Sequence, residues 1–107
     1  METMGIHRVD KASGETFPIT FDYTGELPSN VTISSATGAA VKKSSGSADN
    51  SVLNSTTLTT TSSTVTLYVT GGTDGESYLI TATVTCSGSP ATVLEEYIEL
   101  TITDQPF

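Results

Sequence analysis

The chain has 107 residues, a length typical of a single domain. With 4 Lys and Arg against 12 Asp and Glu, its formal net charge is −8, so the chain as a whole repels nucleic-acid phosphates. No apolar run approaches the roughly 20 residues that span a bilayer. The single His and single Cys exclude most catalytic constellations. We therefore expect a protein that is not an enzyme and has no cofactor, no nucleic-acid partner and no membrane partner.

Charge and composition are both uneven along the chain. All four basic residues precede residue 44, so residues 1–43 carry four bases and five acids (net −1), whereas residues 44–107 carry seven acids and no base (net −7). Such a lopsided domain is easiest to understand if one end stays in water and the other docks. The 21 Thr and 14 Ser favour half-exposed sheet surfaces. Alternation of period 2 recurs, while helical periodicity is absent, which predicts an all-β protein.

The first half of the chain gives weak strand signals. Residues 1–15 are polar and lack a period, so we expect an N-terminal arm here and a single β-sandwich domain over residues 16–107. Ser44–Ser51 is typical of a flexible loop. The expected strands before residue 64 are Phe17–Tyr23, Val31–Ser35, a short piece over Ala39–Lys43 after a break at Thr37-Gly38, and one or two weak strands within Val52–Ser63.

The second half alternates clearly. One face of each strand is apolar: Val65, Leu67 and Val69; then Tyr78, Ile80, Ala82, Val84 and Cys86; then Leu94, Ile98, Leu100 and Ile102 within Val93–Thr103. Turn signals recur about every 8–12 residues, so we expect a sandwich of about seven antiparallel strands without a disulfide. The expected core is Ile19, Phe21, Ile33, Val65, Leu67, Val69, Ile80, Val84, Ile98 and Leu100.

Several polar groups have alternative interpretations. Glu95, Glu96 and Glu99 form the densest group of carboxylates. Glu95 and Glu99, on one strand face, meet the spacing of a glycosidase pair, but solvated acids on an edge strand are the commoner arrangement. Asp74 and Glu76, with Asp49 and Asn50, offer oxygen ligands for Ca²⁺ without the usual loop pattern, so turn chemistry is preferred. We expect no metal site.

The single His and the single Cys are not expected to form a site. His7 has no second ligand nearby, and Cys86 is in phase with buried positions and is expected to be a small core residue.

A tyrosine corner is expected where Asp74 and Gly75 precede Tyr78. In immunoglobulin-like sandwiches, a Tyr near the start of the penultimate strand sends its hydroxyl back to the preceding loop. The segment Val65–Ile102, VTLYVTGGTDGESYLITATVTCSGSPATVLEEYIELTI, resembles small immunoglobulin-like virion proteins of tailed bacteriophages, of the tail-fibre adaptor, neck or head-decoration type. The upstream stretch Phe21-Asp22-Tyr23, Leu27 and Ile33-Ser34-Ser35 looks like the first strands of the same family.

The resemblance implies a non-enzymatic structural component of a tailed phage particle, made in the bacterial host cytoplasm. It would bind neighbouring virion proteins at the neck or tail-fibre adaptor region, in several symmetry-related copies. Two alternatives stay open: a capsid decoration protein, and a carbohydrate or host-surface binding module that would use Tyr23, Tyr68 and Tyr97. We expect the arm to lie on an adjacent subunit, and its assembly contacts are Ile6, Arg8, Val9 and Lys11.

Overall fold

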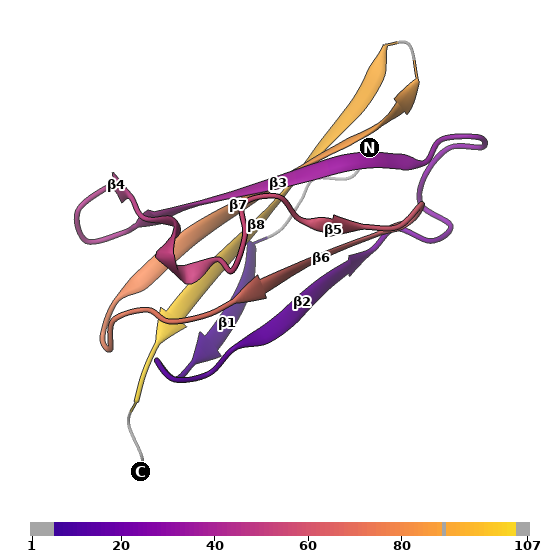
Figure 1. The fold of residues 1–107 in the computed structure, drawn as a ribbon. Helices are drawn as coiled ribbons and strands as arrows, with labels where there is room; N and C mark the ends of the chain where they lie inside the picture. The colour runs from indigo at the N-terminus through magenta and orange to yellow at the C-terminus, as the bar shows by residue number, and fades with distance from the viewer. Residues whose placement is uncertain (1–5, 89, 105–107) are drawn as a thin grey trace.

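A computed structural model describes residues 6–88 and 90–104 of the chain. The protein is all-β, with a single short 3-10 helix, η1, among the described residues (Figure 1). None of the described residues belongs to a helix long and apolar enough to cross a membrane. In chain order the elements are β1 (Ile6–Lys11), β2 (Phe17–Asp22), β3 (Ile33–Lys42), β4 (Ser47–Ala48), η1 (Asn50–Val52), β5 (Thr59–Thr60), β6 (Thr64–Val69), β7 (Ser77–Gly88) and β8 (Ala91–Ile102).

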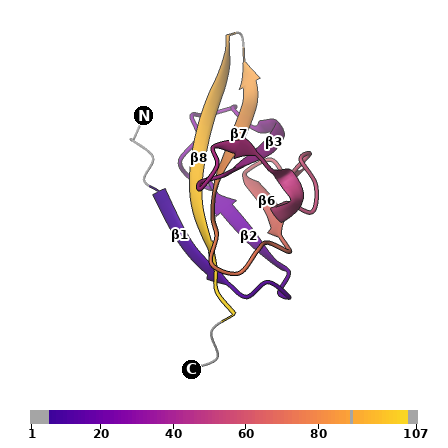
Figure 2. The ribbon, with the colours of Figure 1, turned by 90° about the vertical axis from the view of Figure 1, so that its left-hand side faces the viewer.

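The strands form two sheets that share one core. The larger sheet has the order β1-β8-β7-β3-β4 and the smaller has the order β2-β6-β5. Pairing is antiparallel except at the edge, where β1 runs parallel to β8 from Ile6 opposite Tyr97 to Lys11 opposite Ile102 (Figure 2). The described strands thus number eight rather than about seven, and one pair is parallel.

The core lies between the inner faces of the two sheets, as the alternation predicted. Nine of the ten expected core residues are buried, and the tenth, Ile19, is partly buried and packs against the cluster. The free Cys86 is 1% exposed, in line with Ala82 and Val84 on the inner face of β7. The long β7–β8 hairpin extends beyond the neighbouring strands (Figures 1 and 2).

The N-terminal segment differs from the expected arm. Ile6–Lys11 form β1 and add to the edge of the larger sheet, while residues 1–5 lie outside the described residues. The sequence pattern that would predict this strand is weak because the inward positions of β1 are His7, Val9 and Lys11, of which only Val9 is aliphatic. Val9 packs against the core, and Lys11 is 2% exposed.

Strand β3 continues through the expected break at Gly38. Ala36, Gly38 and Ala40 form its buried face. A Cβ atom at Gly38 would lie 3.3 Å from Leu58 and 3.4 Å from Leu53, so the glycine leaves room for two leucines to pack over the strand. The Ser-rich middle of the chain thus contributes core leucines rather than regular strands, and β5 is its only described strand after η1.

Candidate interface

The loop between β6 and β7 is held at one end of the sandwich by the expected corner residues. Tyr78 is 1% exposed, and its hydroxyl accepts a hydrogen bond from the backbone N–H of Thr73 at 3.2 Å. Gly75 adopts a φ of +88° and donates its N–H to the carbonyl of Ile102. The Asp74 carboxylate accepts the backbone N–H of Asp104 at 2.9 Å. These residues therefore act within the chain, tying the loop to the end of β8.

Lys11 belongs to the same end and does not reach the surface as an assembly contact would. Its ammonium donates to the carbonyl oxygens of Ala12 at 2.6 Å, Ser13 at 3.3 Å and Gly71 at 2.6 Å. Burial lowers the pKa of Lys11, while Glu15 and Asp104 raise it. Lys11 thus holds β1 and its following turn against the loop after β6.

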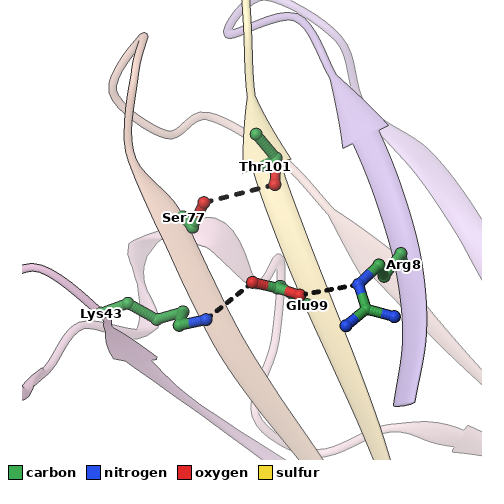
Figure 3. A network of polar contacts seen from close by, with 5 residues as sticks. All are labelled: Arg8, Lys43, Ser77, Glu99 and Thr101. Atoms are coloured by element: carbon green, nitrogen blue, oxygen red, sulfur yellow. Dashed lines mark hydrogen bonds and ion pairs between the residues drawn. The ribbon is translucent and has the colours of Figure 1, made fainter.

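Arg8 is engaged within the chain on the outer face of the larger sheet. Its Nε donates to Glu99 Oε1 at 3.1 Å, and Lys43 Nζ donates to Glu99 Oε2 at 2.7 Å (Figure 3). These two contacts hold the pKa of Glu99 below its usual range, and Lys43 has a larger effect than Arg8. The side chains of Ser77 and Thr101 form a hydrogen bond between β7 and β8 beside the contacts of Glu99. One carboxylate therefore links β1, β8 and the end of β3.

The three clustered glutamates are divided between two faces of β8. Glu95 and Glu99 lie on the outer face, where Glu95 accepts a hydrogen bond from the Tyr97 hydroxyl. Glu96 points inward and is 7% exposed. The spacing of Glu96 from Leu94 and Ile98 was a signal for this inward position, which the expectation of solvated acids missed.

Glu96 joins three elements through side-chain contacts. Tyr23, just after β2, donates its hydroxyl to Glu96 Oε2 at 2.7 Å, and His7 Nε2 lies 3.2 Å from Glu96 Oε1. The His7 ring also contacts Phe21, with ring centroids 5.4 Å apart. Burial strongly raises the pKa of Tyr23, and the hydrogen bond to Glu96 raises it further. The Tyr23 hydroxyl therefore stays protonated and remains a donor.

Two hollows adjoin at this cluster, and we call them together the β8 groove. One, of about 280 Å³, is lined by His7, Thr20, Phe21, Asp22, Tyr23, Glu26 and Glu96. The other, of about 350 Å³, is lined by Tyr23, Glu26, Leu27, Pro28, Thr92, Val93 and Leu94. Tyr23 and Glu26 line both. The groove runs along the first half of β8 and combines aliphatic walls with three carboxylates.

The remaining candidate sites do not come together. Tyr23 is 4% exposed and so is not the exposed aromatic that carbohydrate binding would need, while Tyr68 on β6 is 45% exposed. The Asp49 carboxylate caps η1 through Ser51, and the Asn50 side-chain oxygen accepts the N–H of Ala40. Across residues 6–88 and 90–104, no three His, Cys, Asp or Glu side chains form a group of metal-site size.

The sequence of the chain matches a known protein family. Residues 11–101 match the family described as "Podophage GP4 fiber-tail adaptor protein gp77". The chain belongs to this family of phage fibre-tail adaptors. An adaptor of this family is a structural component of a phage particle, which agrees with the resemblance seen in the sequence at the level of the tail-fibre adaptor.

Other comparisons inform only the fold of the adaptor. No curated protein matches the chain. One solved structure of similar fold is a nucleoside hydrolase-related hypothetical protein from Saccharophagus degradans that is associated with carbohydrate metabolism. The similarity has a TM-score of 0.50 at 13% identity and covers 92% of this chain but 22% of that one. The adaptor thus spans about a fifth of that protein's length.

Proposed function

We propose that this chain is a non-enzymatic adaptor that joins tail and fibre proteins in the particle of a tailed phage. The observation that carries the proposal is the family match over residues 11–101. The two-sheet sandwich supplies surfaces for neighbouring subunits, and we expect it to assemble in several symmetry-related copies because phage tails are symmetric. Synthesis takes place in the cytoplasm of the bacterial host.

We further propose that the sandwich is immunoglobulin-like. The order β1-β8-β7-β3-β4 in one sheet and β2-β6-β5 in the other supports this proposal, with β7 as the penultimate strand. Tyr78 lies at the start of β7, and its hydroxyl reaches back to the preceding loop. The single free Cys86 means that the core holds the two sheets together without the inter-sheet disulfide of antibody domains.

The adaptor function is tested in purified particles of the phage that encodes the chain. Deleting the gene should yield particles that keep their heads but lose their fibres, and supplying the chain in trans should restore fibre attachment. Mass spectrometry and electron microscopy of the particles measure both results. Localisation of the chain on the capsid surface, with fibres retained in the deletion, would instead support capsid decoration.

A further inference from the structure

The outer edge of β8 is only half covered. Strand β1 pairs with β8 from Tyr97 to Ile102, whereas Ala91–Glu96 pair with β7 on the other side. Among the described residues, none forms a ladder with the outer edge of Ala91–Glu96. A strand edge with unpaired backbone N–H and C=O groups is a template for an added strand.

Apolar surface lies directly beside this free edge. Val93 is 55% exposed, the most exposed of the large hydrophobic residues described. Thr92, Val93 and Leu94 form one wall of the larger hollow, and Leu27 and Pro28 form the other. An aliphatic side chain of an added strand would remove this surface from water, which backbone hydrogen bonds alone would not do.

The charge of the β8 groove defines the chemistry of its occupant. Asp22, Glu26 and Glu96 line the groove, and among its lining residues only His7 is able to carry a positive charge. No Lys or Arg lines either hollow. A basic side chain on the occupant would complement these acids. A second copy of this chain would instead bring a net charge of −8 and a matching set of acids.

We propose that the edge of β8 over Ala91–Glu96 takes up an extended, basic segment of a tail or fibre protein as an added strand. An aliphatic side chain of that segment occupies the hollow beside Val93, and a Lys or Arg lies next to Glu26. This inference rests on the proposed adaptor function and names the surface and the chemistry by which the adaptor holds one partner.

Site-specific cross-linking in assembled particles tests the inference. A photo-crosslinking residue in place of Val93 should link the chain to a Lys- or Arg-containing segment of a tail or fibre protein, identified by mass spectrometry. The same residue in place of Val41, an exposed valine on β3 (37%), is the matched control and should not link to that segment. Links only to a second copy, to residues 1–5 of the same chain, or to nothing would overturn the proposal.

Charge variants provide a second, independent test of the inference. Val93→Asp and Glu26→Lys should each lower incorporation into particles at least tenfold while the thermal midpoint of the free protein stays unchanged, and Val41→Asp should incorporate normally. Normal incorporation of both groove variants, or equal loss in all three, would overturn the docking surface while leaving the adaptor function intact. Absence of the unaltered chain from particles would refute the adaptor function itself.

Discussion

Glu96 is a carboxylate on an inward position of β8, where burial of a charge is costly unless partners replace water. The Tyr23 hydroxyl at 2.7 Å and the His7 ring at 3.2 Å are those partners. The raised pKa of Tyr23 keeps that donor protonated. This contact holds the chain after β2 against the larger sheet and shapes the floor of the β8 groove.

A double-mutant cycle measures this contact. Tyr23→Phe should lower the free energy of unfolding by about 1.5–3 kcal/mol, the range for a hydrogen bond to a charged group. Its effect should shrink in a Glu96→Gln background because the charged acceptor is already gone. Urea denaturation of the four proteins provides the measurement.

Tyr78→Phe is the matched control for this cycle. It removes a buried hydroxyl that accepts from Thr73, should cost about 1 kcal/mol, and should add to Glu96→Gln without coupling. Strict additivity of Tyr23→Phe and Glu96→Gln would show that the 2.7 Å contact does not contribute to stability.

Glu99 holds three strands of the larger sheet together. Arg8 from β1 and Lys43 from the end of β3 both contact its carboxylate (Figure 3). The pKa of Glu99 is lowered in the folded protein, so the folded state binds this proton less readily than the unfolded chain does. The resulting stability is present above the unfolded pKa of about 4.3 and is lost as the pH falls through the lower folded pKa.

Acid titration of stability should reveal this contribution. The thermal midpoint should fall as the pH is lowered from about 5 toward 2, and it should fall less steeply in Glu99→Gln, which has no carboxylate to protonate. The thermal midpoint of Glu99→Gln should still depend on pH, because hydrogen bonds to nearby residues also lower the pKa values of Asp22, Asp49 and Asp104. Equal slopes in the two proteins would show that the ion pairs of Glu99 do not stabilise the fold.

The sequence predicts elements well where one strand face is uniformly apolar. Strands β6, β7 and β8 follow from period-2 alternation because the inner faces of both sheets bury them. Strand β1 is not predicted by the same pattern because its inward positions include the polar residues His7 and Lys11. Their contacts to Glu96 and to the carbonyl of Gly71 join parts of the chain that are distant in sequence. The continuity of β3 at Gly38 likewise depends on Leu53 and Leu58, which no local pattern connects to it.

The whole molecule is elongated, with principal extents of 47 × 25 × 23 Å. One end is tied by Lys11, Asp74 and Asp104, while the β7–β8 hairpin extends from the other (Figure 1). Lys11, Arg8 and Lys43 each contact acceptors within the chain, and the net charge of the whole chain is −8. The β8 groove was not predictable from sequence because residues from β1, β2, the following loop and β8 line it.

Removing β1 tests how far the edge strand belongs to the folded domain. A chain that begins at Ala12 loses the packing of Val9, the buried Lys11 and the Arg8–Glu99 pair, and it exposes the edge of β8. Its free energy of unfolding, measured by urea denaturation, should fall by about 1–2 kcal/mol, because the partly buried Val9 and the buried stem of Lys11 lose their packing. A chain that begins at Ile6 retains all of β1 and should keep the stability of the full sequence. Equal stability of all three chains would support a dispensable N-terminal arm and would assign Ile6–Lys11 to contacts with a neighbouring subunit.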